Sequence, residues 1–489
     1  MGSRTRLTQK QSSAALSKTL LKPRLEPISP NWFKDKKILI FGLGLHDAGV
    51  GAIEYLINQG AAITITDVKT KEELLPSIKK LEKYQSKIVY HLGGHQEKDF
   101  KNHDLIIKSV AIPKENPWLK IAEKAGLLIE TDISLFFKLS PSKIVGITGT
   151  KGKTTTTSLV YLLLKKQYPK KVVLGGNIRK SVLRQLPKLT DKHLAVLELS
   201  SFQLDSLSLA NRSPNVSIIT NIYPDHLNWH RNIKDYVNAK KNIFRFQKKD
   251  DYAVFNFDNP KTKNITSQFE AKKIPFSLIK KSMLYYLDKT GQVWEKGRKM
   301  TNVSRFPLKG KHNWYNTVAA IAGTRLLGVS KINIERVLST FKAPSGRQEK
   351  VRTLKGVSFY NDTTATGVEA MVAALERFGP EYPKKLVFIS GGVDKGVDYR
   401  PIKSLVKKYL KALVLLEGTA SEKIFETVKD VPGLIIKKYF SDFQKAIKRA
   451  FRLASAGDAV ILCPGGASFN MFQHEFDRGD QFVACVKNL

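Results

Sequence analysis

Cysteine is scarce in this chain, which has only Cys463 and Cys485 among its 489 residues. A small disulfide-stapled fold needs several cysteine pairs, and a structural zinc site needs about four closely spaced cysteine or histidine ligands. Neither pattern is present, so the sequence excludes a disulfide framework and does not suggest zinc. Because so few cysteines are consistent with a reducing compartment, we expect a cytoplasmic protein.

Long apolar runs are also missing. No stretch approaches the ~20 residues that are needed to cross a bilayer, and the apolar run within Ser158 to Leu164 is short and followed by lysines. Residues 1–35 are rich in Lys, Arg, Ser and Pro but lack the apolar centre of a secretory signal. We therefore expect a basic flexible tail over residues 1–35, no export and no membrane insertion.

Acidic residues are few relative to basic ones. Asp and Glu number 43 against 82 Lys and Arg, which gives a formal net charge of +39 and raises the question of a nucleic-acid partner. The basic residues are nevertheless spread through every predicted element, and no nucleic-acid-binding motif accompanies them. The alternative is a lysine-rich enzyme with anionic substrates, and on this interpretation we expect no specific nucleic acid.

The length of the chain is enough for about three domains of roughly 100–200 residues. Alternating strand and helix patterns predict an α/β fold with mainly parallel sheets. We place a Rossmann-like domain at residues 36–140, a central ATP-binding domain of the P-loop type at 141–343, and a second Rossmann-like domain at 344–489. A Pro/Gly/Ser segment, Ala343 to Gly346, separates the last two and is called the joint below.

The first glycine turn follows the apolar run Lys37 to Phe41 and consists of Gly42, Leu43 and Gly44. A helix pattern from about Ala48 to Gln59 and a strand pattern from Ala62 to Asp67 come next. This βαβ order is typical of a nucleotide-binding domain, with Asp67 ~20 residues beyond the glycines, where a ribose-binding acid would lie. The glycine pattern is incomplete, since Asp47 stands at its third position, and a plain strand-to-helix turn stays an open alternative.

The second glycine turn follows the strand pattern Lys143 to Thr148 and precedes a helix that ends near Lys166. In such a turn, backbone N–H groups surround phosphate oxygens, while a lysine adds charge and a threonine reaches Mg²⁺. Lys153 and Thr154 fill these two roles, although Ile147 stands where the strict motif has its first glycine. The predicted ATP contacts are Gly149, Thr150, Lys151, Gly152, Lys153, Thr154 and Thr155.

Further motifs run in a fixed order from Gly42 to Gly479, and together they resemble the Mur ligase family. Gly146 to Thr156 is similar to that family's phosphate loop, and Leu197 to Leu204 is similar to a segment of its glutamate-adding members. The other matching segments are Thr220 to His230, Tyr236 to Lys240, Gly310 to Asn316, Asn361 to Thr366, Gly391 to Gly396, Pro464 to Phe469 and Phe476 to Gly479.

The resemblance implies a set of catalytic and metal-binding residues. It assigns magnesium to Thr154 and Glu198, and a second ion to His226 and Lys240, the lysine acting as a ligand if it is carbamylated. It adds His312 and Asn313 to the ATP contacts. The catalytic residues that it implies are Lys153, His226, Lys240 and Arg347.

The resemblance also implies the reaction and its partners. A family member of this type uses ATP and Mg²⁺ to join glutamate to UDP-N-acetylmuramoyl-L-alanine through an acyl phosphate, as a monomer, during synthesis of the bacterial wall precursor on which cell shape and division depend. The UDP-substrate contacts would be Gly44, Leu45, His46, Asp67, Ser109 and Asn177. The amino-acid contacts would be Thr364, Ser468 and Phe469.

Several positions depart from the family pattern and leave alternatives open. Thr364 stands where many glutamate-adding members have a lysine, so the choice between D- and L-glutamate stays open. Arg179 and the segment Ser109 to Pro113 also differ from the usual residues. The rival hypotheses are a related ligase for alanine or a diamino acid, a folylpolyglutamate synthase-like ligase, a nicotinamide oxidoreductase built on Gly42 to Asp67, and a basic P-loop protein that acts on nucleic acid.

Overall fold

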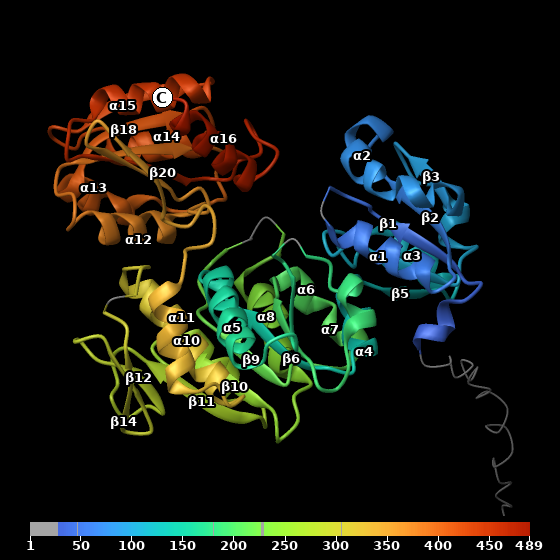
Figure 1. Ribbon diagram of the computed structural model, residues 1–489. Helices are drawn as coiled ribbons and strands as arrows, with labels where there is room; N and C mark the ends of the chain where they lie inside the picture. The colour runs from blue at the N-terminus through green and yellow to red at the C-terminus, as the bar shows by residue number, and fades with distance from the viewer. Residues whose placement is uncertain (1–27, 46, 179, 226–228, 305) are drawn as a thin grey trace, which may run out of the picture.

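The chain forms three lobes in sequence order, each built around one β-sheet (Figure 1). The computed structural model describes residues 28–45, 47–178, 180–225, 229–304 and 306–489. The strands of the three sheets fall within residues 37–130, 143–302 and 349–465. Across this described part of the chain, no helix combines the length and the apolar character needed to cross a membrane.

The first lobe has a five-stranded parallel sheet in the order β3-β2-β1-β4-β5. Its central strand β1 is buried on both faces, since Ile38 and Ile40 pack into one apolar cluster and Leu39 and Phe41 into another. The strands are β1 Lys37–Phe41, β2 Ala62–Asp67, β3 Ile88–Leu92, β4 Leu105–Lys108 and β5 Leu128–Glu130. The α-helices are α1 Asp47–Asn58, α2 Lys71–Ile78, α3 Pro117–Lys124 and α4 Asp132–Leu139.

The second lobe has a nine-stranded sheet in the order β14-β13-β12-β11-β10-β9-β6-β8-β7. The pairs from β7 to β12 are parallel, whereas β12, β13 and β14 pair antiparallel and extend one edge. The strands are β6 Lys143–Thr148, β7 Val172–Gly176, β8 Leu194–Glu198, β9 Val216–Ile219, β10 Tyr252–Asn256, β11 Lys272–Ser277, β12 Tyr285–Leu287, β13 Gln292–Glu295 and β14 Arg298–Asn302.

Helices cover both faces of the second sheet. Helix α5 packs against α10 and α11, and the apolar side chains of α5 and α10 join those of β6 and β9 in one core cluster. The α-helices of this lobe are α5 Lys153–Gln167, α6 Ser201–Asp205, α7 Leu207–Ala210, α8 Ile233–Arg245, α9 Pro260–Thr266, α10 Lys311–Arg325 and α11 Lys331–Thr340.

The third lobe has a six-stranded sheet in the order β15-β16-β20-β17-β18-β19, in which only β15 is antiparallel to its neighbour. The strands are β15 Glu349–Leu354, β16 Val357–Asn361, β17 Leu386–Gly391, β18 Leu410–Leu416, β19 Ile435–Phe440 and β20 Ala459–Gly465. The α-helices are α12 Val368–Phe378, α13 Lys403–Tyr409, α14 Thr419–Val428, α15 Phe443–Leu453 and α16 Glu475–Lys487. The predicted α/β class is thereby confirmed.

Ion pairs and hydrogen bonds hold the lobes against one another. Arg184, in a short 3₁₀ segment of the second lobe, pairs with Asp47 and Glu54 on helix α1 of the first lobe. Arg347, just after the joint, donates to the Thr154 hydroxyl at the start of helix α5. The loop at the carboxyl end of β6 therefore lies near the start of the third lobe, and ligands of open α/β sheets bind at such strand ends.

Candidate active site

The phosphate loop connects β6 to α5 in a conformation that requires glycine at two positions. Gly149 has a φ of +151°, and a Cβ built there would lie 1.9 Å from the Thr220 hydroxyl oxygen. Gly152 has a φ of +87°, and its built Cβ would lie 2.1 Å from Asn316 Oδ1. The loop is thus packed closely by the side chains around it, and its backbone leads directly into the N-terminus of α5.

Lys153 is the first residue of α5 and turns its ammonium group back over the loop. Its Nζ donates to the carbonyl oxygens of Gly149 and Thr150, both at 2.9 Å. Burial lowers its pKa to about 8, and the carboxylate of Glu198 acts in the opposite direction. A buried cation held at a helix N-terminus is placed to meet the oxygens of a phosphate.

Lys240 on α8 is buried, with only 1% of its surface exposed, although its neighbour Lys241 is partly exposed. Its Nζ donates to Gly149 O at 3.0 Å and lies 4.8 Å from the centre of the Tyr236 ring. Burial, followed by the charge of Lys153, holds the pKa of Lys240 well below its usual range. The lysine-rich face of this helix is therefore not uniformly solvated, since Lys240 lies inside the site.

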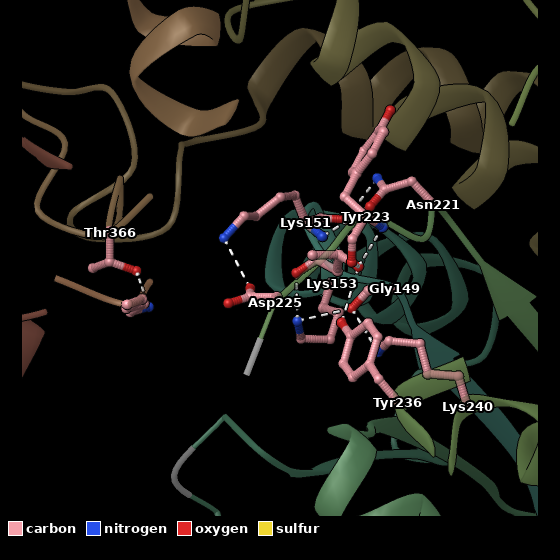
Figure 2. A network of polar contacts seen from close by, with 11 residues as sticks. Gly149, Lys151, Lys153, Asn221, Tyr223, Asp225, Tyr236, Lys240 and Thr366 are labelled. Atoms are coloured by element: carbon pink, nitrogen blue, oxygen red, sulfur yellow. Dashed lines mark hydrogen bonds and ion pairs between the residues drawn. The ribbon is translucent and has the colours of Figure 1, made fainter. Parts of the chain in front are cut away.

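The segment after β9 folds over the phosphate loop through a network of polar contacts (Figure 2). Asn221 Oδ1 accepts from the Lys151 backbone N–H at 2.9 Å, and the Tyr223 backbone N–H donates to the Thr150 hydroxyl at 2.9 Å. Lys151 Nζ forms an ion pair with Asp225 at 3.1 Å. Lys151 therefore points to the carboxylate of Asp225, whereas Lys153 points back over the loop.

Glu198 ends strand β8 and presents an unsatisfied oxygen beside the loop. Its Oε1 accepts from Asn177 Nδ2 at 2.9 Å, and its Oε2 is buried with no hydrogen-bond partner among the described residues. A buried carboxylate oxygen without a donor is expensive unless a cation binds it. The residues therefore fit a hard, oxygen-seeking ion such as Mg²⁺.

The described residues contain no other cluster of side chains that could bind a metal. Within the described residues, no group of three or more His, Cys, Asp or Glu side chains could hold a metal ion. His226, predicted to hold a second ion, lies outside the described residues, as does His46 of the predicted UDP contacts. Of the predicted metal ligands, Thr154, Glu198 and Lys240 therefore lie within the described residues.

The nucleotide residues predicted on α10 meet the segment that follows the joint. His312 Nε2 lies 3.2 Å from Gln348 Nε2, and Asn313 Nδ2 donates to Lys309 O at 3.0 Å. Arg347 Nη2 donates to Thr154 Oγ1 at 2.9 Å. His312 and Asn313 of the second lobe therefore contact Gln348, while Arg347 beside it reaches the start of α5.

The predicted amino-acid contacts lie on the third lobe, and the structure places Thr364 differently from the other two. The Thr364 hydroxyl donates to Gly346 O of the joint at 3.0 Å, so this side chain anchors the joint. Ser468 is buried in the loop after β20, and Phe469 beside it is 72% exposed. Lys395 places a cation next to Thr366, because its Nζ donates to Thr366 Oγ1 at 3.0 Å. Burial lowers the pKa of this lysine.

Four of the predicted UDP contacts, Gly44, Leu45, Asp67 and Ser109, lie on the first lobe. Asp67 accepts from the backbone N–H groups of Gly44 at 3.1 Å and Lys69 at 3.0 Å, so its carboxylate organises this loop. Leu45 is 40% exposed, and the Ser109 backbone N–H donates to Phe41 O. Asn177, by contrast, lies with Glu198 at the phosphate loop.

Sequence reasoning missed three site residues. Tyr236, whose hydroxyl lies 2.9 Å from Thr150 Oγ1, stands in a matching segment but was given no role of its own. His230 is 5% exposed, lies 3.0 Å from Ser201 Oγ and stacks on Phe202. Lys395 lies within a glycine motif that gave no role to its lysine. All three residues stand in segments that resemble the Mur ligase family, and this resemblance is the signal that could have found them.

Family models account for most of the chain. The MurD-like N-terminal domain of Mur ligases matches residues 36–130, and the Mur ligase middle domain matches residues 147–324. The glutamate ligase domain of Mur ligases matches residues 346–466. The three models follow the order of the three sheets.

Curated relatives match over nearly the whole length. A UDP-N-acetylmuramoylalanine–D-glutamate ligase from Roseiflexus sp. is 37% identical over 467 residues, which cover 93% of this chain and 99% of the relative. An enzyme of the same name from Acetivibrio thermocellus is 35% identical over 472 residues, covering 93% and 97%. Both relatives therefore align across all three lobes.

Solved structures of lower identity share the fold. The UDP-N-acetylmuramate-alanine ligase MurC from Thermotoga maritima superposes with a TM-score of 0.63 at 19% identity, over 93% of this chain and 99% of that one. MurF from Acinetobacter baumannii gives a TM-score of 0.60 at 16% identity, over 94% and 92%. With the three family models and the full-length relatives, this likeness leads to one conclusion: the chain belongs to the Mur ligase family.

Proposed function

We propose that this chain is an ATP-dependent ligase that joins D-glutamate to UDP-N-acetylmuramoyl-L-alanine in the synthesis of the peptidoglycan precursor. The observation that carries the proposal is the meeting of the Lys153 loop with the unsatisfied oxygen of Glu198. The names of the full-length relatives support the choice of both substrates. A nicotinamide oxidoreductase built on the first turn would leave this second loop without a use.

In the first step, an oxygen of the alanine carboxylate attacks the γ-phosphorus of ATP, and ADP leaves with the electrons of the broken P–O bond. This step brings two anions together, so positioning and positive charge supply most of the catalysis. Lys153 neutralises phosphate oxygens, and Arg347 stabilises the phosphoryl group in transfer. Asn177, held by Glu198, orients the muramoyl-alanine part.

In the second step, the amino group of glutamate attacks the acyl carbon of the acyl phosphate. A tetrahedral intermediate forms, phosphate leaves with the bridging oxygen, and the nitrogen releases a proton as the amide forms. Closure of the third lobe on the second would exclude water, which would otherwise hydrolyse the acyl phosphate. The hydrogen bond from Arg347 to Thr154 already links the segment after the joint to the start of α5.

Magnesium fits the described residues at one position. Thr154 and Glu198 would hold it, and it would supply charge neutralisation of the β- and γ-phosphate oxygens. A second ion is also part of the proposal, and Lys240 would be one of its ligands after its neutral amine has added CO₂ and released a proton to form a carbamate. The burial of Lys240 beside Gly149 supports this role, because a buried neutral amine is the form that reacts with CO₂.

Lys395 is proposed to bind a carboxylate of the incoming glutamate together with Thr366. The lysine that many glutamate-adding members have at position 364 is absent here, and the Thr364 hydroxyl is directed to the joint. Lys395 would supply the missing charge, because it is partly buried and its ammonium group is held by Thr366. Ser468 and Phe469 complete the proposed amino-acid site.

The direct test supplies the purified protein with UDP-N-acetylmuramoyl-L-alanine, ATP and Mg²⁺, and a panel of D-glutamate, L-glutamate, L-alanine and meso-diaminopimelate. We expect phosphate release that depends on D-glutamate, and a product heavier than the substrate by one glutamyl residue. Release that depends on a different amino acid would replace the proposed acceptor. No release with any of them would contradict the ligase function itself.

The acceptor site has its own test in Lys395→Ala. We expect the KM for glutamate to rise by about tenfold or more, since one charge-assisted hydrogen bond is lost, while the KM for ATP changes little. Lys407→Ala, on the exposed face of α13, is the matched control and should behave as the unaltered protein. Equal KM values for glutamate in the two variants would remove Lys395 from the acceptor site.

A further inference from the structure

Gln348 lies two residues after the joint and touches both of the lobes that the joint connects. Its backbone has a φ of +50°, in the left-handed region that residues with a side chain seldom adopt. Its backbone N–H donates to Asp362 Oδ1 of the third lobe at 3.2 Å. Its side-chain amide reaches His312 and Asn313, on helix α10 of the second lobe. Such strain persists only where the surroundings hold it.

The amide of Gln348 can face its neighbours in only one way. Lys309 O can only accept, and it lies 3.0 Å from Asn313 Nδ2, while Asn316 Nδ2 donates to Asn313 Oδ1 at 3.3 Å. These two contacts fix which atom of the Asn313 amide is nitrogen. Asn313 Nδ2 also donates, over a long 3.5 Å, to Gln348 Oε1, which leaves Gln348 Nε2 facing the imidazole ring of His312.

The orientation of Gln348 sets the proton position on His312. Gln348 Nε2 can only donate, so His312 Nε2, at 3.2 Å, must accept. Burial, followed by the charge of Arg377, lowers the pKa of His312 to about 4, so the ring is neutral at pH 7. A neutral ring that accepts at Nε2 carries its one proton at Nδ1.

We propose that Gln348 is a positioning residue of the nucleotide site, which holds His312 as the neutral Nδ1–H tautomer and Asn313 in a single amide orientation. This inference rests on the proposed function insofar as His312 and Asn313 contact ATP. A nucleotide group that meets His312 at Nδ1 must then be a hydrogen-bond acceptor. The segment that follows the joint thereby sets what the nucleotide site can recognise.

The same contacts continue to the phosphate loop. Asn313 accepts from Asn316, and Asn316 Oδ1 lies against Gly152, where even a Cβ would approach to 2.1 Å. A change in the joint that moved Gln348 would therefore be felt at Asn313, Asn316 and the loop. This path gives the third lobe a physical connection to the nucleotide site that does not pass through substrate.

The test compares two variants of nearly the same shape with a control. Gln348→Glu replaces the donating amide with a carboxylate that can only accept, and Gln348→Met removes the hydrogen bonds. Ser345→Ala, which lies in the joint and touches Glu349 but not His312, is the control. The readout is the ¹⁵N chemical shifts of the His312 ring in histidine-labelled full-length protein, assigned by their loss in His312→Gln.

We expect the Nδ1–H pattern in the unaltered protein and in Ser345→Ala. Gln348→Glu should give the Nε2–H pattern or the doubly protonated ring, and Gln348→Met a mixture of tautomers. An Nε2–H pattern in the unaltered protein would overturn the proposal. Ring shifts that stay unchanged in Gln348→Glu would overturn it as well, because a merely structural glutamine would not control the tautomer.

Nucleotide binding is the second readout, measured by calorimetry with ATP and Mg²⁺. The dissociation constant should rise about three- to tenfold in Gln348→Glu and Gln348→Met, the range expected for one hydrogen bond, and less than about twofold in Ser345→Ala. Altered ring shifts with unchanged ATP affinity would overturn the link to the nucleotide. Because the ring shifts are recorded without ATP, a failure of the unaltered protein to bind ATP would contradict the proposed function separately.

Discussion

The two glycine turns that open the first and second lobes share a strand-turn-helix topology but differ in the charge at their centres. At the first turn, the carboxylate of Asp67 accepts from the backbone N–H of Gly44 and from that of Lys69, which follows β2. In the second, the ammonium groups of Lys153 and Lys240 donate to the carbonyl oxygen of Gly149. An anion thus occupies the loop amides of the first turn, while cations gather over the second.

This difference shows why the topology alone does not reveal the ligand. A turn whose amides are occupied by a carboxylate is suited to neutral hydroxyl groups, and a turn with cations at a helix N-terminus is suited to phosphates. We therefore expect the first turn to meet hydroxyl groups of a nucleotide-linked substrate. We expect the second turn to hold a triphosphate.

Removing Lys153 is the sharpest way to break the comparison. Lys153→Ala takes away the cation that covers the second turn, and we expect phosphate release to fall by about 10³-fold, as when a group that stabilises transition-state charge is lost. Binding of the UDP substrate, measured by calorimetry, should stay within about twofold. Lys166→Ala, exposed on the same helix, is the control and should keep full activity. Similar losses in the two variants would contradict the assignment.

A second pair of variants tests the buried cation. Lys240→Ala should lower phosphate release by about 10²-fold, because it removes both the charge beside Gly149 and the proposed metal ligand. Lys241→Ala, the neighbour on the same helix, should stay within about twofold. The two rates are measured by steady-state phosphate release. If both variants keep their activity, Lys240 has only a structural role.

The first turn can be weakened alone by Asp67→Asn. An amide has only one accepting oxygen, so one of the two backbone N–H groups of this loop loses its partner. We expect the KM for the UDP substrate to rise by about five- to thirtyfold, the range for one buried group left unsatisfied, with no change in the KM for ATP. An equal rise in both KM values would mean that Asp67 stabilises the fold as a whole and not this turn alone.

The smallest expected effect is the contribution of His312 to the stability of the protein in acid. Burial lowers the pKa of His312 to about 4, so between pH 6.5 and 4 the unfolded chain binds more protons at this residue than the folded chain. Stability from His312 is therefore present above pH 6.5 and is lost as the pH falls. His312→Gln should therefore lose less stability than the unaltered protein over this range, by about 1 kcal/mol once the partial exposure of His312 is discounted. Thermal unfolding followed at several pH values measures the difference.

Buried strands and the phosphate loop were predictable because their signals are local. The runs Lys37 to Phe41, Ala62 to Asp67 and Lys143 to Thr148 became β1, β2 and β6 with unchanged bounds. Each is a short apolar run that ends in a turn. The antiparallel strands β12, β13 and β14 were missed, since they are three to five residues long, and β13 and β14 also carry charged side chains.

The site was predictable where its residues are neighbours in sequence, and not where they meet only after folding. Gly149 to Thr155 stand together in one motif, but Tyr236 lies 86 positions from Thr150, and Gln348 lies 36 positions from His312. The burial of Lys240 beside the exposed face of its helix is likewise a result of tertiary packing. A single sequence carries no signal for such contacts outside matched segments.

The central claim is that the second turn places ATP so that a carboxylate oxygen attacks the γ-phosphorus. Its most direct test uses UDP-N-acetylmuramoyl-L-alanine with ¹⁸O in the alanine carboxylate, in a complete reaction with ATP, Mg²⁺ and D-glutamate. Mass analysis of the released phosphate should show one ¹⁸O atom per phosphate, transferred through the acyl phosphate. Phosphate without label, formed while the amide product accumulates, would contradict the claim.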